Sequence, residues 1–214
     1  MSEARELPKW RTERTTGIAA IAGALVVSAA IWLAINRYAP VARGMEDLSA
    51  RMLFALKCLG VATLFCVVGG VEAVAHERLQ SAAFDPLRNF ETRRLRVNLR
   101  YLQNTLEQIV VFAVGLFGLA AYARDGEAMR AVLATTVVWI LGRFAFWIGY
   151  HRSAARRGLG APGMAIGMIV LLYVVWHVGE DVAGAVGGWV LVGAFLILEA
   201  ILFRTTGAAQ PMPS

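Results

Sequence analysis

Charged and amide side chains recur at helical spacing inside one apolar stretch near the middle of the sequence. Arg100, Asn104 and Glu107 fall at positions i, i+4 and i+7. A rotation of about 100° per residue would bring the three within about 60° of one another on one helical face. Arginine binds carboxylates through its planar guanidinium, so this face could hold an anionic ligand.

A second polar stripe lies in the next apolar stretch, where Tyr150 and Arg157 follow Arg143 at i+7 and i+14. If the two helices run antiparallel, Arg143 and Glu107 lie at similar depth, because Arg143 is seven residues before Tyr150 and Glu107 is seven residues after Arg100. The stripes then predict one shared pocket, rich in arginine, with one carboxylate and one amide. The alternative is a buried Glu107–Arg143 ion pair that fixes helix packing, with the remaining arginines contacting lipid phosphate.

The elements that must hold these residues are membrane-spanning helices. The sequence is 58% hydrophobic and only 17% charged, and its mean hydropathy is +0.59. Soluble domains are nearer 45–50% apolar and about 25% charged. No alternation typical of an outer-membrane barrel strand is seen, so the predicted fold is an all-α membrane bundle. The apolar blocks are Gly17–Ile35, Met52–Ala75, Tyr101–Ala123, Ala131–Tyr150, Gly163–Val178 and Ala185–Phe203.

Each block approaches the roughly 20 residues that a span needs, although the fifth is short. Six spans are therefore predicted, with five spans or a re-entrant segment near Val178–Gly188 as alternatives. The first block follows a basic leader, as a signal peptide would. Its apolar core is longer than the usual 7–15 residues, which favours an uncleaved helix.

The distribution of Lys and Arg predicts the orientation. With six spans and the N-terminus inside, inner segments carry fourteen of the 21 basic residues and outer segments carry five. Basic loops face the cytoplasm, so this count favours a cytoplasmic N-terminus. The net charge of +6 then reflects topology and anionic lipid headgroups rather than nucleic acid. No folded nucleic-acid-binding module is recognised.

Two further patterns carry little chemistry. Gly158–Gly163 matches GxGxxG but lies between two predicted membrane helices and contains Pro162, so it is interpreted as a flexible turn. Cys58 and Cys66 lie eight residues apart on one span, about 12 Å along a helix, which is too far for a disulfide. No metal site is predicted.

The two polar stripes resemble the motifs of a known family. Arg100-Tyr-Leu-Gln-Asn104-Thr-Leu-Glu107 is similar to the R-x3-N-x2-E signature of the MAPEG family, the membrane-associated proteins in eicosanoid and glutathione metabolism. Arg143, Tyr150 and Arg157 resemble that family's next helix, in which R-x6-Y precedes a further arginine. The resemblance covers roughly Met52 to Val178, the extent of the family's four-helix core.

The resemblance implies a homotrimer that uses glutathione as co-substrate against a lipophilic molecule, without a metal. By analogy, Arg100, Asn104 and Glu107 would hold the carboxylates and amino group of glutathione. Tyr150 would add a hydroxyl contact, and Arg143 would help form the polar base of the site. The catalytic residue implied is Arg157, which would bind and activate the thiol.

The sequence also departs from the family pattern, because Phe146 stands where some members have a second tyrosine. A non-catalytic protein of the same fold, serving as a scaffold or binding another small anion, is the alternative function. A transporter with a Glu107–Arg143 relay is a further one, although inverted repeats and broken midplane helices are not recognised.

Three segments are expected along the chain. Residues 1–51 would form a basic leader and an extra membrane helix, 52–178 the four-helix core, and 179–214 a further membrane helix and a disordered tail. Among the basic residues 19 are Arg and 2 are Lys, which weakly favours a bacterial source. The expected location is the bacterial inner membrane, with the main basic loops cytoplasmic.

Overall fold

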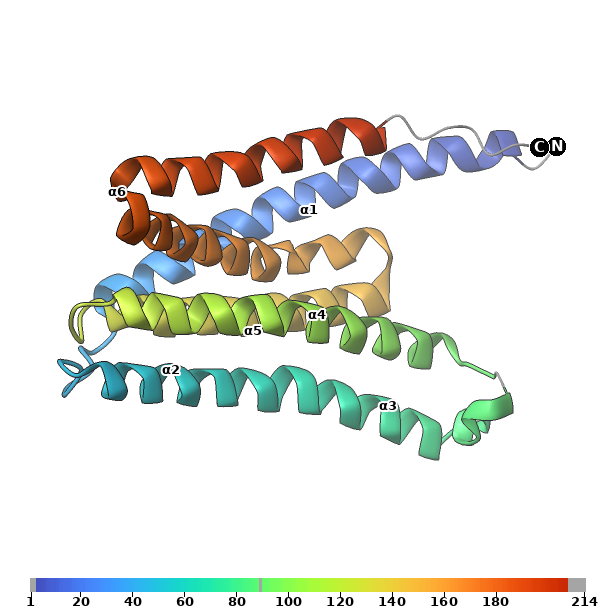
Figure 1. Cartoon of the computed structure of the whole chain (residues 1–214). Helices are drawn as coiled ribbons and strands as arrows, with labels where there is room; N and C mark the ends of the chain where they lie inside the picture. The colour runs from blue at the N-terminus through green and yellow to red at the C-terminus, as the bar shows by residue number, and fades with distance from the viewer. Residues whose placement is uncertain (1–2, 89, 208–214) are drawn as a thin grey trace.

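The computed structural model of the chain describes the backbone of residues 3–88 and 90–207 and the side chains of residues 14–87 and 90–205. The described chain is a bundle of helices without strands, which confirms the predicted all-α membrane fold (Figure 1). Five helices are long and apolar enough to cross a membrane. The expected disorder of the tail concerns residues 208–214, which lie outside the described part of the chain. The elements are α1 (Glu3–Tyr38), α2 (Leu48–Ala62), η1 (Thr63–Val68), α3 (Gly69–Leu79), η2 (Ala82–Phe84), η3 (Pro86–Arg88), α4 (Arg93–Tyr122), α5 (Met129–Arg152), η4 (Ala155–Gly160) and α6 (Ala161–Gly207).

The second predicted span is one continuous apolar helix, Leu48–Leu79, that contains a π-helical turn. This turn, η1, widens the helix between α2 and α3. The Cys66 carbonyl in η1 accepts a hydrogen bond from the buried Tyr101 hydroxyl at 3.0 Å. Tyr101 follows Arg100 on α4, so this contact fixes the rotation of the helix that carries the first polar stripe. Cys58 and Cys66 are both buried free thiols.

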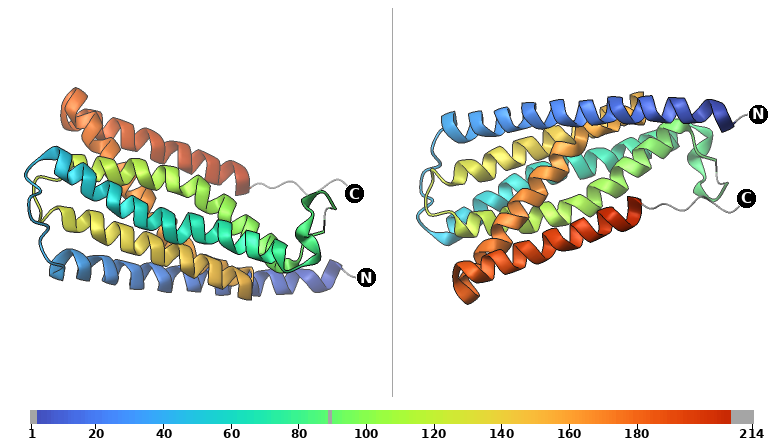
Figure 2. Two further views of the ribbon diagram at one scale, coloured as in Figure 1. Left: turned by 90° about the horizontal axis from the view of Figure 1, so that it is seen from below. Right: turned by 90° about the horizontal axis from the view of Figure 1, so that it is seen from above.

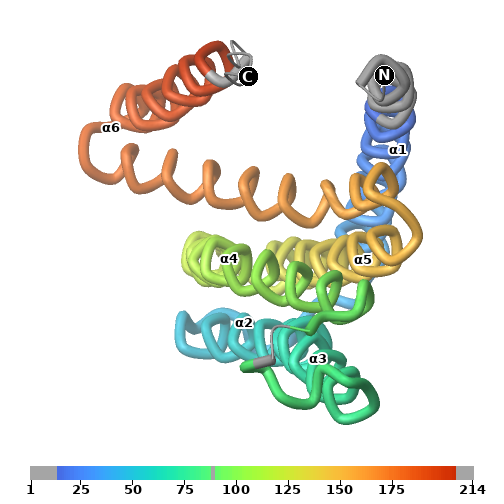
Figure 3. Tube along the Cα trace, turned by 90° about the vertical axis from the view of Figure 1, so that its right-hand side faces the viewer, coloured from blue at the N-terminus to red at the C-terminus, as the bar shows by residue number. Residues whose placement is uncertain are grey.

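The last two predicted spans are two limbs of α6, which reverses direction within the helix (Figure 3). The backbone leaves the helical region at Ala183 and Gly184, where φ/ψ are −141°/24° and 66°/−168°. The conformation of Gly184 is one that residues with a Cβ scarcely adopt. Each limb has the length of about 20 residues that a membrane crossing needs. The reversal falls within Val178–Gly188, the segment for which the sequence left a re-entrant structure as an alternative.

The bundle is layered, as the view along its axis shows (Figure 3). α4 and α5 form the middle layer, with α2 and α3 on one side and α1 and α6 on the other (Figures 2 and 3). The apolar core lies where α2, α4 and α5 meet, and the rings of Phe112 and Trp139 stack there at 4.5 Å. Small buried residues such as Ala55 and Ala62 allow the helices to approach closely, as in other membrane bundles.

Candidate functional site

A cavity of about 430 Å³ opens between α4, α5, η4 and the start of α6. All six residues predicted from the two stripes line it, so the structure brings the whole set together. Its other lining residues come from the same four elements. The lining residues are Arg100, Gln103, Asn104, Glu107, Gln108, Arg143, Phe146, Tyr150, Arg157, Gly158, Gly160, Ala161 and Met164.

The α4 wall of the cavity is a chain of hydrogen-bonded side chains. Arg100 Nη1 donates to Gln103 Oε1 at 3.2 Å, and Gln103 Nε2 donates to Glu107 Oε1 at 3.3 Å. Gln108 Nε2 donates to Asn104 Oδ1 at 3.2 Å. Neither glutamine was predicted as a site residue, although each follows a predicted residue by three or four positions, the spacing of neighbours on a helix.

Arg143 forms the floor of the cavity and is only 1% exposed. Its Nη2 donates to Asn104 Oδ1 at 3.0 Å, and its Nη1 donates to Gln108 Oε1. The guanidinium carbon also lies 4.7 Å from the centre of the Phe146 ring, within the range of a cation–π contact. Its Nε is buried without a hydrogen-bond partner. One donor of this cation is therefore free within the described structure.

The alternative of a Glu107–Arg143 ion pair is not the arrangement found. Among the ion pairs of the described residues none joins these two, and Arg143 binds two amides instead. The helix rotation explains this outcome. At about 100° per residue, Asn104 and Gln108 lie to one side of Arg100, and Glu107 lies to the other. Glu107 is exposed, whereas both amides are half-buried.

Arg157 reaches the cavity from η4, a 3-10 helix that leads directly into α6. The inter-helix connection predicted around Gly158–Gly163 is therefore helical, made of the end of η4 and the first residues of α6. Gly160 is pressed against α5 so closely that a Cβ at this position would lie 2.2 Å from the Cβ of Phe146. This close contact holds η4 beside Tyr150 and Arg143. No hydrogen bond or ion pair among the described residues engages the Tyr150 hydroxyl or the Arg157 guanidinium.

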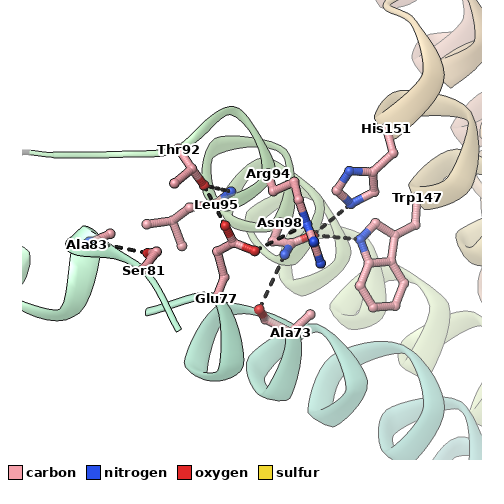
Figure 4. Close-up of polar contacts among 10 residues, drawn as sticks. All are labelled: Ala73, Glu77, Ser81, Ala83, Thr92, Arg94, Leu95, Asn98, Trp147 and His151. Carbon is pink, nitrogen blue, oxygen red and sulfur yellow. Dashed lines mark hydrogen bonds and ion pairs between the residues drawn. The ribbon is translucent and has the colours of Figure 1, made fainter. Parts of the chain in front are cut away.

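A second polar cluster, centred on Asn98, secures α4 against its neighbours (Figure 4). Asn98 Nδ2 donates to the Ala73 carbonyl of α3 at 3.3 Å. Its Oδ1 lies 2.9 Å from both Trp147 Nε1 and a ring nitrogen of His151, both on α5. Asn98 is 3% exposed and lies two residues before Arg100, the first residue of α4 that lines the cavity. The cluster therefore fixes how α3, α4 and α5 are spaced where the polar stripes begin.

The start of α4 is held by Thr92 and Glu77 in the same region (Figure 4). Thr92 Oγ1 accepts the Leu95 backbone N–H at 3.0 Å and donates to Glu77 Oε1 at 2.7 Å. Glu77 also pairs with Arg94 at 3.2 Å and is largely buried. These contacts cap the helix and tie it to the end of α3, which keeps the Arg100 stripe in place.

The cavity combines three arginines with one carboxylate, so it suits a small ligand that carries several negative charges and one positive charge. Its volume is within the range of roughly 300–1,000 Å³ typical of small-molecule sites. Within residues 3–88 and 90–207, no group of three or more His, Cys, Asp or Glu side chains is arranged to hold a metal ion.

The fold and cavity define a class of helical membrane protein with a polar, arginine-rich cavity near one end of the bundle. The MAPEG family profile matches residues 15–179, and the chain belongs to this family. The match starts within α1 and ends shortly before the reversal in α6. Membership points to a membrane function in glutathione or eicosanoid metabolism, in a family whose members generally use glutathione and are typically trimeric.

The chain is also similar to an uncharacterized protein, sll1147, of Synechocystis sp.. The two are 39% identical over 87 residues, which are 38% of this chain and 61% of that protein. The chain thus matches less than two thirds of that relative's length. The similarity to a cyanobacterial protein supports a bacterial origin. No solved structure matches the chain.

Proposed function

We propose that the chain is a glutathione-dependent membrane transferase or peroxidase that acts on a lipophilic electrophile. The observation that carries this proposal is the meeting of Arg100, Asn104, Glu107, Tyr150 and Arg157 around the buried Arg143 in one cavity. These six residues come from two helices and η4, and three of the six (Arg143, Tyr150 and Arg157) have a polar group without a partner in the described chain. Family membership adds the expectation that the ligand is glutathione.

The charges of the cavity complement those of glutathione, which carries two carboxylates and one ammonium group at neutral pH. Arg100 can bind a carboxylate, because arginine donates in a planar, charge-assisted geometry, and the buried Arg143 adds positive charge at the polar base of the site. Glu107 can accept from the ammonium group. Asn104 holds Arg143 in position through its amide oxygen, and its amide nitrogen can donate to the peptide backbone of the ligand. Tyr150 can donate from its hydroxyl.

Arg157 is the residue proposed to activate the thiol. The reactive species is the thiolate, and an ordinary thiol has a pKa of about 8.5. Lowering this pKa to about 7 requires roughly 2 kcal/mol, which one charge-assisted hydrogen bond can supply. The exposed Arg157 guanidinium at the mouth of the cavity can donate such a bond. The thiol proton leaves to solvent, and sulfur then forms a bond to the electrophile as its leaving group departs.

Phe146 favours a second candidate, a non-catalytic protein that binds another small anion or serves as a scaffold. Its ring covers Arg143, and Tyr150 is left as the single hydroxyl among the cavity-lining residues. A site with fewer donors near the thiol could still bind an anion without activating it.

We further propose a homotrimer in a bacterial inner membrane, with residues 52–178 as the glutathione-binding core between two added membrane helices. The N-terminus and the main basic loops would face the cytoplasm. This proposal rests on the family's usual assembly and on the basic residues concentrated at the end of the bundle that holds Arg100 and Arg157.

Glutathione binding to the detergent-purified chain, measured by calorimetry, tests the proposal. Saturable binding is expected in the wild type and a loss of at least about tenfold in Arg100→Ala and in Glu107→Ala, since one lost charged hydrogen bond is worth about 1.5–3 kcal/mol. Arg96→Ala is the matched control, an exposed arginine of α4 outside the cavity. Absence of binding at millimolar glutathione, with the protein folded, would contradict the proposal. Binding without turnover of generic electrophiles or peroxides would favour the non-catalytic candidate.

A further inference from the structure

A second and larger cavity, of about 1160 Å³, lies toward the opposite end of the bundle. It opens between α1, the α4–α5 connection and the first limb of α6. Its volume exceeds the range of roughly 300–1,000 Å³ usual for small-molecule sites. α1 forms one whole wall, and it is held to α5 by a hydrogen bond of 3.1 Å from Trp32 Nε1 to Thr135 Oγ1. We refer to this cavity as the α1–α6 groove.

The body of the α1–α6 groove is apolar. Leu25, Leu33, Val138, Ile166 and Ile169 line it, all at the depth of membrane-spanning helices. It is separate from the arginine-rich cavity, because the first turns of α6 stand between the two. Different residues of these turns line each cavity, so the groove is not part of the cavity proposed to bind glutathione.

One end of the groove carries charged residues where α1 ends and α5 begins. Two of them are carboxylates that already have partners. Asp125 Oδ1 accepts the backbone N–H groups of Glu127 and Ala128 at 2.9 Å each. Glu127 pairs with Arg130 at 3.1 Å. Both acids are therefore engaged in capping and supporting the start of α5.

A third carboxylate, Asp181, lies outside the lining and accepts a hydrogen bond from the groove-lining Tyr122 at 2.6 Å. The remaining charged residues that line this end are arginines. Arg37 and Arg124 line the groove, and among the described residues no ion pair engages either one. Arg130, whose side chain is 14% exposed, also has a buried Nε without a partner. The lining of the groove thus has an apolar body within the membrane and, at the membrane surface, three arginines against two carboxylates.

We propose that the α1–α6 groove binds one membrane lipid with an anionic headgroup. Its acyl chain would lie along the apolar wall formed by α1 and α6, and its headgroup would lie at Arg37 and Arg124. Charge complementarity favours this occupant, because arginines near a membrane surface attract anionic lipids. An apolar partner helix would fill the body of the groove but leave the cations at its end without counter-charge.

Native mass spectrometry of the delipidated full chain, titrated with phosphatidylglycerol or with phosphatidylcholine of the same acyl chains, tests this assignment. One phosphatidylglycerol is expected to bind roughly tenfold more tightly than phosphatidylcholine. Each arginine near the membrane surface contributes about 1 kcal/mol to the binding of an anionic lipid, and a tenfold change in affinity corresponds to about 1.4 kcal/mol. The double variant Arg37→Ala/Arg124→Ala should bind both lipids equally. Arg43→Ala, an exposed arginine at the same end but outside the groove, should bind like the wild type.

Filling the groove provides a test that is independent of charge. Ile169→Trp, at a position 60% exposed on the α6 wall, should reduce the binding of both lipids. Ala29→Trp on the α1 wall serves the same purpose if the first variant does not fold. Leu198→Trp on the second limb of α6 is the control and should have no effect.

Equal affinity of the wild type for both lipids, or an anionic preference kept by the double arginine variant, would overturn the assignment. A change of oligomeric mass in the filled variants with lipid binding intact would also overturn it, because the groove would then be a contact between copies. None of these readouts requires glutathione.

Discussion

Arg143 and Arg157 line the same cavity in different environments. Arg143 is buried and donates to Asn104 and Gln108, whereas Arg157 is exposed and has no hydrogen-bond partner in the described chain. A buried cation with two amide partners supports the packing of α5 on α4. An exposed cation at the mouth is available to a ligand. The two arginines should therefore differ in what their removal changes.

Arg143→Ala is expected to lower the thermal stability of the protein in detergent. The substitution removes the hydrogen bonds that Arg143 donates to Asn104 and Gln108, and a hydrogen bond to a charged group contributes about 1.5–3 kcal/mol. Thermal unfolding followed by intrinsic fluorescence measures the effect. Arg100→Ala is the comparison, because Arg100 is exposed and its loss should weaken ligand binding without changing the unfolding temperature. Equal stability of both variants would contradict this assignment of roles.

Arg157→Ala should keep glutathione binding but raise the pKa of the bound thiol. A guanidinium favours the thiolate, so its removal should return the thiol pKa from about 7 toward its ordinary value of about 8.5. The ultraviolet absorbance of the thiolate, recorded against pH, measures the shift. Activity lost at neutral pH should recover partly as pH rises. Arg156→Ala, the adjacent exposed arginine outside the cavity, should leave the profile unchanged.

At the scale of elements, the reversal within α6 depends on one backbone conformation. Hydropathy alone predicts two apolar blocks separated by a short polar segment, and both limbs are helical as expected. The segment between them is no extended loop. Ala183 and Gly184 alone leave the helical region, so the whole change of direction is concentrated at two residues.

Gly184→Ala is therefore expected to destabilise the arrangement of the two limbs. A residue with a Cβ at φ 66° and ψ −168° is strained by about 1–3 kcal/mol. The measurement is the rate of limited proteolysis at the reversal, together with thermal stability. Gly193→Ala is the control, because a Cβ there meets no atom within 4 Å and alanine is the better helix former. Equal proteolysis of the two variants would show that Gly184 is not required.

At the scale of the whole molecule, the chain has an even number of crossings if both limbs of α6 span the membrane. α1 begins and α6 ends at the same end of the bundle (Figure 1). The cavity residues Arg100 and Arg157 lie toward that end, together with most of the basic residues of the sequence. The positive-inside rule therefore predicts that this end faces the cytoplasm.

Topology reporters check this assignment. A fluorescent protein fused to the C-terminus should fold and fluoresce, and an alkaline phosphatase fusion at Ala183 should be active, because the two positions would lie on opposite sides. If a fluorescent protein at the C-terminus does not fluoresce and an alkaline phosphatase at the same position is active, the second limb of α6 does not return across the membrane.

The sequence by itself determined the helical membrane fold, the two polar stripes and their common depth. Hydropathy sums over neighbouring residues, and a helix turns by a fixed angle per residue, so these features depend on local order along the chain. The arrangement of Arg100, Asn104 and Glu107 on one helical face could be read in this way. The similar depth of these residues and of the stripe of Arg143 and Tyr150 could be read in the same way.

Only the tertiary structure decided which groups meet. Arg143 binds Asn104 and Gln108 rather than Glu107, η4 presses against Phe146, and Tyr101 reaches the π-helical turn at Cys66. The α1–α6 groove likewise requires helices that are distant in sequence. These contacts depend on how far each helix is rotated and how closely it approaches its neighbours. Packing between the helices sets both quantities, and the period of a single helix does not contain them.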